Sequence, residues 1–468
     1  MPFKERPSGA SVNRPALAVA EGVRFGGVGN ADTLQRLLLK VVPAFIFLNL
    51  LFGDYCDYYS RVYNPLPIPY KLLAFVLLGL KLVIAICLIL CLVRDGMRQA
   101  RIPAPLVLFL LFSIALSIVH SLYPDRVIAG SYIEFGAQGL GNQGVQLHPS
   151  SLINYMSRNV DLLVLVSAGA VISDRTNMLR AICSATLLAL PFHLINGILQ
   201  FSGFFITGIE NSGAVFFSTS SEYVSIGQRM TGLFVSPFYY SIYLAFAQYL
   251  LYLIDFRYKH LLSVLLLAFN VMSLTRSGIV LWFVVECFCL KDYWEQRDWR
   301  YIALFSCLGA TILLFVLAFF DVRAGIFQRL FQPLNAEQNF SFMSRTTVPF
   351  LNLGEMLFHE PFLLLFGVGN VTTIGADSNL VSSIYQEGVL YTIFYYGIMI
   401  AMARRCPKRS NPILAILITS AVLFSGSNQT VIFIAYFLLS LFLYEGSEQP
   451  NMDVAAMRGG LLRNSSGA

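Results

Sequence analysis

Residues 71–93 read KLLAFVLLGLKLVIAICLILCLV, and after Lys71 at its start Lys81 is the one charged residue of this run. A helix needs roughly 20 apolar residues to cross the hydrocarbon core of a bilayer, so the stretch predicts a membrane span. Runs of similar character recur along the chain on both sides of it. The predicted spans are twelve: 38–53, 71–93, 104–121, 153–173, 181–204, 232–255, 260–275, 277–290, 301–320, 384–403, 411–427 and 429–444.

The composition of the whole chain agrees with this interpretation. Of 468 residues, 56% are hydrophobic and only 12% are charged, with a mean hydropathy of +0.67. These values lie outside the soluble globular class. We therefore expect an all-α integral membrane protein with about 12 transmembrane helices, in one membrane domain over residues 37–444. Residues 1–36 and 445–468 are expected to be disordered cytosolic arms.

Lysine and arginine are distributed unevenly between the predicted loops. Every second loop is short and basic, whereas the longer intervening loops carry few positive charges. The positive-inside rule then places both termini in the cytoplasm and the intervening loops outside. The formal net charge of +6 is explained by orientation, so no nucleic-acid surface is expected. The basic loops hold Arg94, Arg98 and Arg101; Arg175 and Arg180; Arg257 and Lys259; Lys291, Arg297 and Arg300; and Arg404, Arg405, Lys408 and Arg409.

The longest break between predicted spans is the outer loop 321–384. A protein that only spanned the membrane would have no need for so long a polar loop. Two further outer segments, 122–152 and 205–231, are rich in Gly, Ser and aromatic residues. This elaborated outer face predicts chemistry on that side of the membrane. The loop carries Arg323, Arg329, Arg345, His359, Glu360 and Asp377, and Glu387 follows just beyond its end.

Four arginines lie at or just beyond the predicted outer boundary beside turn-forming sequence: Arg229, Arg276, Arg329 and Arg345. A guanidinium group is always charged and presents a planar fork that fits phosphate oxygens. An arginine near lipid is costly to desolvate unless it is paired or functional. Arginines at the boundary can also extend to lipid headgroups, the interpretation that we favour for Arg323 and Arg329. The candidates for a diphosphate site are Arg229 in GQRMTG (227–232), Arg276 in SLTRSG (273–278) and Arg345 in MSRTT (343–347).

Two features at the end of the long loop have both a structural and a chemical interpretation. Asp377 stands before Ser378 and Asn379, so it could cap the following helix. It could equally act as a general base toward a sugar hydroxyl. The pair Gly367 and Gly369 permits a positive φ or a close approach of backbones.

Taken in order, these motifs resemble the O-antigen polymerase and ligase family, which includes the Wzy-type polysaccharide polymerases. Residues 230–244, MTGLFVSPFYYSIYL, resemble its Gly-x-Phe-x-x-Pro-Asn stretch, and residues 273–278 resemble its Ser-x-Ser-Arg-x-Gly stretch. Arg345, His359–Pro361 and Phe366–Gly369 resemble its Arg…His-Pro-x-x-Gly-x-Gly segment. Ligases of the family usually carry His-Asn before the next span. Here Asp377 and Ser378 occupy that place, which favours a polymerase over a ligase.

The resemblance implies a GT-C-like polymerase/ligase architecture in the bacterial inner membrane. A glycan on undecaprenyl diphosphate would be transferred to the terminal sugar of a second lipid-linked repeat unit. Arg229, Arg276 and Arg345 would bind the donor diphosphate and Asp377 would deprotonate or orient the acceptor hydroxyl. No metal or cofactor is expected, and a chain-length regulator and a flippase are implied as partners. Candidates for stacking on sugars, or for anchoring at the lipid interface, are Phe216, Phe217, Tyr223, Tyr239 and Tyr240.

Two other functions stay open on the sequence alone. Asp54 and Asp57 lie in the first predicted outer loop, where a metal-dependent glycosyltransferase using polyprenyl-monophosphate sugars carries acidic pairs. A secondary transporter would instead place charges near the bilayer midplane. Asp161 and Glu286 could pair with nearby polar groups (Arg158 is one turn from Asp161) or mark a lipid-entry groove. The candidates for such charges are few. They are Lys81, Arg158, Asp161 and Glu286.

Overall fold

The protein is described by a computed structural model in which the regular elements are helices. The described residues are 31–62, 68–95, 102–122, 150–201, 230–234, 237–254, 256–273, 275–295, 354, 357–358, 361–367, 379–423 and 429–445. Within them there is no β-strand.

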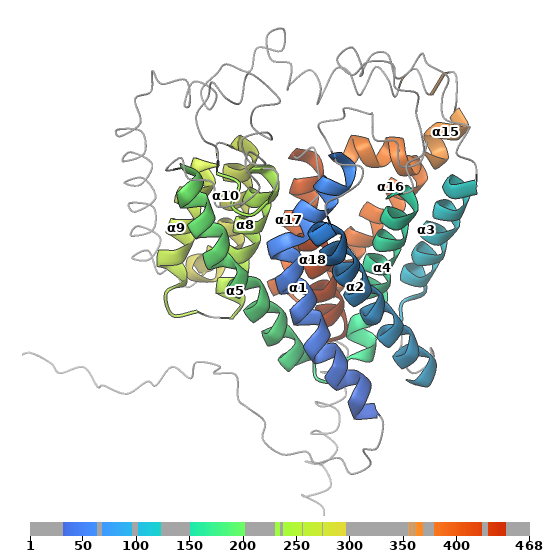
Figure 1. The fold of residues 1–468 in the computed structure, drawn as a ribbon, viewed down its shortest axis with the longest axis horizontal. Helices are drawn as coiled ribbons and strands as arrows, with labels where there is room; N and C mark the ends of the chain where they lie inside the picture. Colours follow the sequence, from blue (N-terminus) through green and yellow to red (C-terminus); the bar gives the residue numbers. More distant parts are fainter. Residues whose placement is uncertain are drawn as a thin grey trace, which may run out of the picture.

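The helices are numbered along the chain as in Figure 1. They are α1 (Ala31–Val62), α2 (Ile68–Asp95), α3 (Ala104–Leu122), α4 (Ser150–Val171), α5 (Arg175–Phe201), α8 (Pro237–Leu253), α9 (Lys259–Met272), α10 (Arg276–Glu295), α15 (Pro361–Phe366), α16 (Asn379–Arg405), α17 (Asn411–Leu423) and α18 (Gln429–Glu445). A short 3₁₀-helix, η2 (Lys408–Ser410), precedes α17.

Eleven of the twelve predicted spans coincide with these helices, and the run 301–320 lies outside the described residues. One boundary differs in a way that matters. Helix α1 continues past its apolar run to Val62, so Asp54 and Asp57 lie on its last turns and not in a loop. The prediction of an acidic pair in a first outer loop was therefore wrong about the local structure.

Local sequence explains where several helices begin. The backbone N–H of Asn177 donates to Asp174 Oδ1 at 3.1 Å, the arrangement of a helix N-cap in front of α5. Helices α8 and α15 begin at Pro237 and Pro361, where a missing N–H has no cost because the first turn lacks acceptors for it.

The outward faces of several helices are apolar. On α2, Phe75 and Val93 are 70% and 74% exposed. Polar side chains such as Ser113, Thr186 and Asn270 are fully buried. This inside-out distribution fits a lipid surrounding. Within the described residues, four segments are long and apolar enough to cross a membrane: Thr33–Gly53, Lys71–Arg94, Ala104–Ser121 and Arg175–Leu199.

The helices lie side by side in a broad bundle (Figure 1). Helices α8, α9 and α10 form a group at one side, α3, α4 and α16 lie at the other, and α1 and α18 lie between them. The closest approach joins α4 to α18, where a Cβ on Gly169 would overlap the backbone of Ser440. Such contacts between small residues are the usual way in which membrane helices pack tightly.

Described residues of three predicted basic loops, those with Arg175, Arg257 and Arg409, lie at one end of the bundle, which we call the basic end. Gln35 Nε2 near the start of α1 donates to the Val171 carbonyl at 2.6 Å. Arg175 Nη1 donates to the carbonyl of Tyr444, at the end of α18, at 2.9 Å. Tyr249 OH donates to the Arg409 carbonyl at 2.9 Å. The N-terminal end of α1 and the C-terminal end of α18 are therefore at the same end as these loops.

Candidate functional site

The predicted site residues are only partly covered by the structure. Arg229, Arg345 and Asp377 lie outside the described residues. Arg276 is the first residue of α10, and its backbone is described but its side chain is not. The segments that flank these residues show how the end opposite the basic end is built.

The turn that carries Arg276 is held by three buried hydroxyl groups, which we call the hydroxyl cluster: Ser241, Ser273 and Thr275. Ser273 Oγ lies 2.9 Å from Ser241 Oγ and 2.7 Å from Thr275 Oγ1, and Ser241 also contacts Thr275. Ser273 Oγ further donates to the Asn270 carbonyl at 2.6 Å, across the last turn of α9. The cluster ties the start of α10 to α8 and α9, so the Arg276 backbone occupies a fixed position.

Helix α5 fixes the segment that follows Arg229. The backbone N–H of Leu233 donates to His193 Nδ1 at 3.2 Å, and Asn196 Nδ2 donates to the Gly232 carbonyl. Gly232 has a φ of +59°, and a Cβ there would press on Tyr240 and His193. The Met230 N–H donates to the carbonyl of Met272 at 3.4 Å. Met272 precedes Arg276 by four residues, so this bond joins the segment after Arg229 to the turn that carries Arg276.

One candidate for sugar stacking is excluded by this packing. Tyr240 is fully buried, and its ring stacks on His193 at 6.4 Å between centroids. Its face is therefore covered by protein, and the prediction that Tyr240 stacks on a sugar was wrong. Tyr239 is partly buried against the core.

At the other side of the same end, residues 361–367, in the long predicted loop 321–384, join α16 through two glycines. Gly367 has a φ of +80° and Gly388 a φ of +87°. A Cβ on Gly367 would overlap the backbone of Gln386 and Glu387, and a Cβ on Gly388 would overlap the backbone of Leu365 and Gly367. The expectation of positive φ and close approach at Gly367 is confirmed; Gly369 lies outside the described residues. His120 at the end of α3 adds a hydrogen bond from Nε2 to the Phe366 carbonyl at 2.9 Å.

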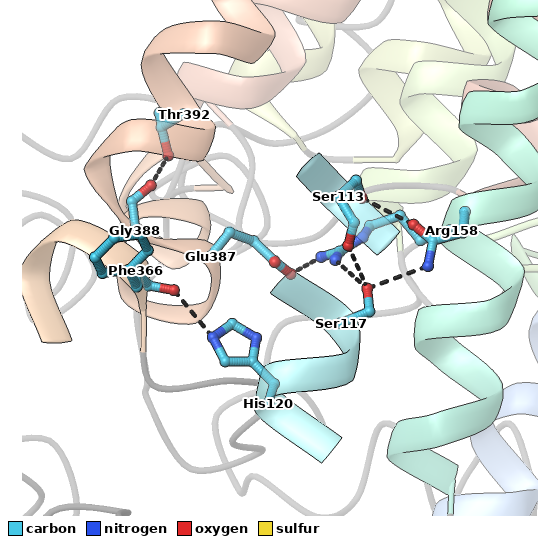
Figure 2. A network of polar contacts seen from close by, with 9 residues as sticks. Ser113, Ser117, His120, Arg158, Phe366, Glu387, Gly388 and Thr392 are labelled. Atoms are coloured by element: carbon cyan, nitrogen blue, oxygen red, sulfur yellow. Dashed lines mark hydrogen bonds and ion pairs between the residues drawn. The ribbon is translucent and has the colours of Figure 1, made fainter. Parts of the chain in front are cut away.

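Beside this contact lies an ion pair between Arg158 of α4 and Glu387 of α16 (Figure 2). Arg158 Nη2 also donates to Ser117 Oγ at 3.2 Å, and its guanidinium lies 5.1 Å from the centre of the Tyr391 ring. Glu387 is 6% exposed, and within the described part of the chain its Oε2 has no hydrogen-bond partner. The carboxylate therefore keeps one free acceptor beside the α15–α16 contact.

The remaining predicted core charges are also paired or hydrogen-bonded. Asp161 pairs with Lys81 of α2 at 2.6 Å, so the expected pairing with Arg158 one turn away was wrong. Arg158 reaches across to α16 instead. Glu286 accepts hydrogen bonds from the hydroxyls of Tyr252 at 2.8 Å and Ser263 at 3.0 Å.

Sequence reasoning noted Glu387 only by its position and did not place it in a site. The available signal was a lone glutamate within the apolar run that follows the loop, because ionisable residues in such runs are usually functional. His120 gave no comparable signal, since a single histidine at a helix end is common. The pair of Arg158 and Glu387 places a fixed cation and a carboxylate acceptor at the same end of the bundle as Arg276.

Comparisons with known proteins add no further assignment. No family model matches the chain, and no curated protein matches it.

Proposed function

We propose that the protein is a glycosyltransferase that polymerises polyprenyl-diphosphate-linked oligosaccharide repeat units on the outer face of the bacterial inner membrane. The proposal includes twelve spans in a GT-C-like arrangement, with the basic end in the cytoplasm. It rests on the resemblance of residues 230–244 and 273–278 to O-antigen polymerases. The hydroxyl cluster is the observation that supports the proposal most strongly. Buried, hydrogen-bonded side chains that hold a turn in place are expected where that turn presents a reacting group.

The proposed reaction is a single transfer. A hydroxyl oxygen of the acceptor sugar attacks the anomeric carbon of the donor glycan. The bond from that carbon to the diphosphate oxygen breaks, and the diphosphate leaves with its bonding electron pair. Arg276, Arg229 and Arg345 neutralise the charge that develops on the leaving group. The proton of the attacking hydroxyl passes to Asp377.

The direct test is polymer analysis in a deletion strain complemented with Arg276→Ala or with wild type. We expect the variant to be expressed and to leave single lipid-linked repeat units without long polymer. The expected loss is at least about a hundredfold, the usual cost of removing one donor to a developing anion. Arg257→Ala is the matched control, since Arg257 lies at the basic end, and it should retain long polymer.

The same strains separate the alternatives. Long polymer that stays on its lipid carrier in the deletion strain would indicate a ligase of the same family. Activity that is lost on chelation of divalent cations would indicate the metal-dependent glycosyltransferase. Normal long polymer in cells carrying Arg276→Ala would contradict the proposed role of the arginine.

One observation favours transport as a second candidate. The Lys81–Asp161 pair is deeply buried between α2 and α4, with the two side chains 9% and 7% exposed. Charges at such a depth mark ion pathways in many transporters. An absence of repeat units from the outer leaflet of the deletion strain would support this function.

A further inference from the structure

A third buried carboxyl group, that of Glu286, lies away from the candidate site. Glu286 is in the middle of α10 and is 4% exposed. Its Oε1 accepts a hydrogen bond from Tyr252 OH at 2.8 Å. Its Oε2 accepts bonds from Ser263 Oγ at 3.0 Å and from the amide of Gln248. Helices α8, α9 and α10 are thus joined through one carboxyl group.

The partners of Glu286 differ in kind from those of the other buried acids. Asp161 and Glu387 each pair with a cation, Lys81 and Arg158 respectively. Among the described residues Glu286 has only neutral hydrogen-bond donors. An ionised carboxylate without a cation is very costly in apolar surroundings, so such a group takes up a proton.

Within the described part of the chain, no lysine, arginine or histidine forms an ion pair or hydrogen bond with Glu286. Lys259 lies over the Tyr252 ring at 5.6 Å from its centre, and Tyr249 donates to a backbone carbonyl. Helix α17, which also packs on α10, has no titratable side chain. Counting only residues whose side chains are described, the titratable groups in the halves of these helices nearest the basic end are Tyr249 and Tyr252 of α8, Lys259 and His260 of α9, and, besides Glu286, Cys287, Cys289 and Lys291 of α10.

A chain of hydrogen bonds connects Glu286 with the basic end. His260, in the first turn of α9, is partly exposed, and its Nδ1 lies 3.2 Å from Tyr252 OH. Tyr252 OH in turn donates to Glu286 Oε1. If Nδ1 carries the hydrogen, both bonds run in the same direction, from the surface toward the carboxyl.

We propose that Glu286 is a proton-binding site that loads from the basic end through His260 and Tyr252. The Nδ1 proton of His260 passes to the Tyr252 oxygen while the hydroxyl proton of Tyr252 passes to Glu286 Oε1. Solvent protonates Nε2 of His260 as the Nδ1 proton leaves, so the imidazole and the tyrosine both end neutral. The ligand is a proton, and the site is independent of the proposed glycosyl transfer.

Infrared spectroscopy of the full protein in liposomes tests this directly. We expect the C=O stretch of a protonated carboxyl at neutral pH, where solvent-exposed carboxyls are ionised, and a shift of this band in D₂O. Glu286→Gln should remove the band, whereas Glu387→Gln, the matched control, should leave it. Tyr252→Phe should slow the D₂O-induced shift by about a hundredfold, the low end of what a positioned proton-transfer group contributes, because the hydroxyl that carries the proton is removed.

Each alternative result overturns a stated part of the proposal. A wild-type spectrum without the band means that Glu286 is ionised. A band that survives in Glu286→Gln belongs to another group. A Tyr252→Phe rate equal to that of the wild type excludes the route from His260. If Glu286→Gln does not fold, ¹³C-glutamate labelling of the wild type decides instead, because a band that fails to shift does not come from glutamate.

Discussion

At the scale of single residues, the molecule is distinguished by how each buried charge is satisfied. Arg158 and Glu387 come from helices far apart in the sequence and meet with most of both side chains covered. A buried ion pair is expensive to desolvate and adds little net stability, but removal of one partner leaves the other uncompensated. The pair therefore acts chiefly to fix α16 against α4 beside the end of the outer loop.

This interpretation predicts rescue by a second substitution. Arg158→Leu should lower the free energy of unfolding by about 3–5 kcal/mol, because Glu387 is left buried without its cation. Arg158→Leu combined with Glu387→Leu should recover most of that loss. Thermal unfolding in detergent measures both effects, with the exposed Arg257→Leu as a control that changes little. If the double variant is as unstable as the single one, the two side chains do not act as a pair.

At the scale of elements, α16 is not one continuous helix. The backbone of Gly388 is non-helical, with φ +87° and ψ +164°, and α15 fits against the break through Gly367. Glu387 stands at this break. The contact joins residues 365–367 to α16 at 386–388, next to the Arg158–Glu387 pair.

Gly388→Ala should consequently be damaging, whereas an alanine elsewhere in α16 should not. A Cβ at Gly388 meets the α15 backbone and also forces a positive φ, for an expected cost of about 2–4 kcal/mol. Gly397→Ala is the matched control, because a Cβ there meets nothing within 4 Å. The two variants are compared by thermal unfolding. Equal stability would show that the α15–α16 contact is not rigid.

At the scale of the whole molecule, the two ends of the bundle differ in charge and in construction. The basic end is tied together by backbone carbonyls that accept from Gln35, Arg175 and Tyr249. The opposite end holds the hydroxyl cluster and the α15–α16 contact. An asymmetry of this kind is expected when only one end performs chemistry.

The orientation of these ends is open to experiment. Because basic loops face the cytoplasm, a fluorescent protein fused after residue 468 should fold and fluoresce in the cytoplasm. Alkaline phosphatase fused within 122–152 should be active outside, and the same fusion after Arg257 should be inactive. Activity at Arg257 together with inactivity in 122–152 would reverse the assignment and place the Arg276 turn in the cytoplasm.

The sequence by itself determined the helical class, the positions of eleven described helices and the alternation of basic and weakly charged loops between them. Hydropathy and charge are properties of each stretch alone. It also indicated the positive φ of Gly367. The tertiary structure alone decided which helices meet: Arg158 with Glu387 and not Asp161, Lys81 with Asp161, and Tyr240 buried on His193. Such pairings depend on how each helix is rotated and packed against its neighbours, and one-dimensional patterns do not specify rotation or distance between helices.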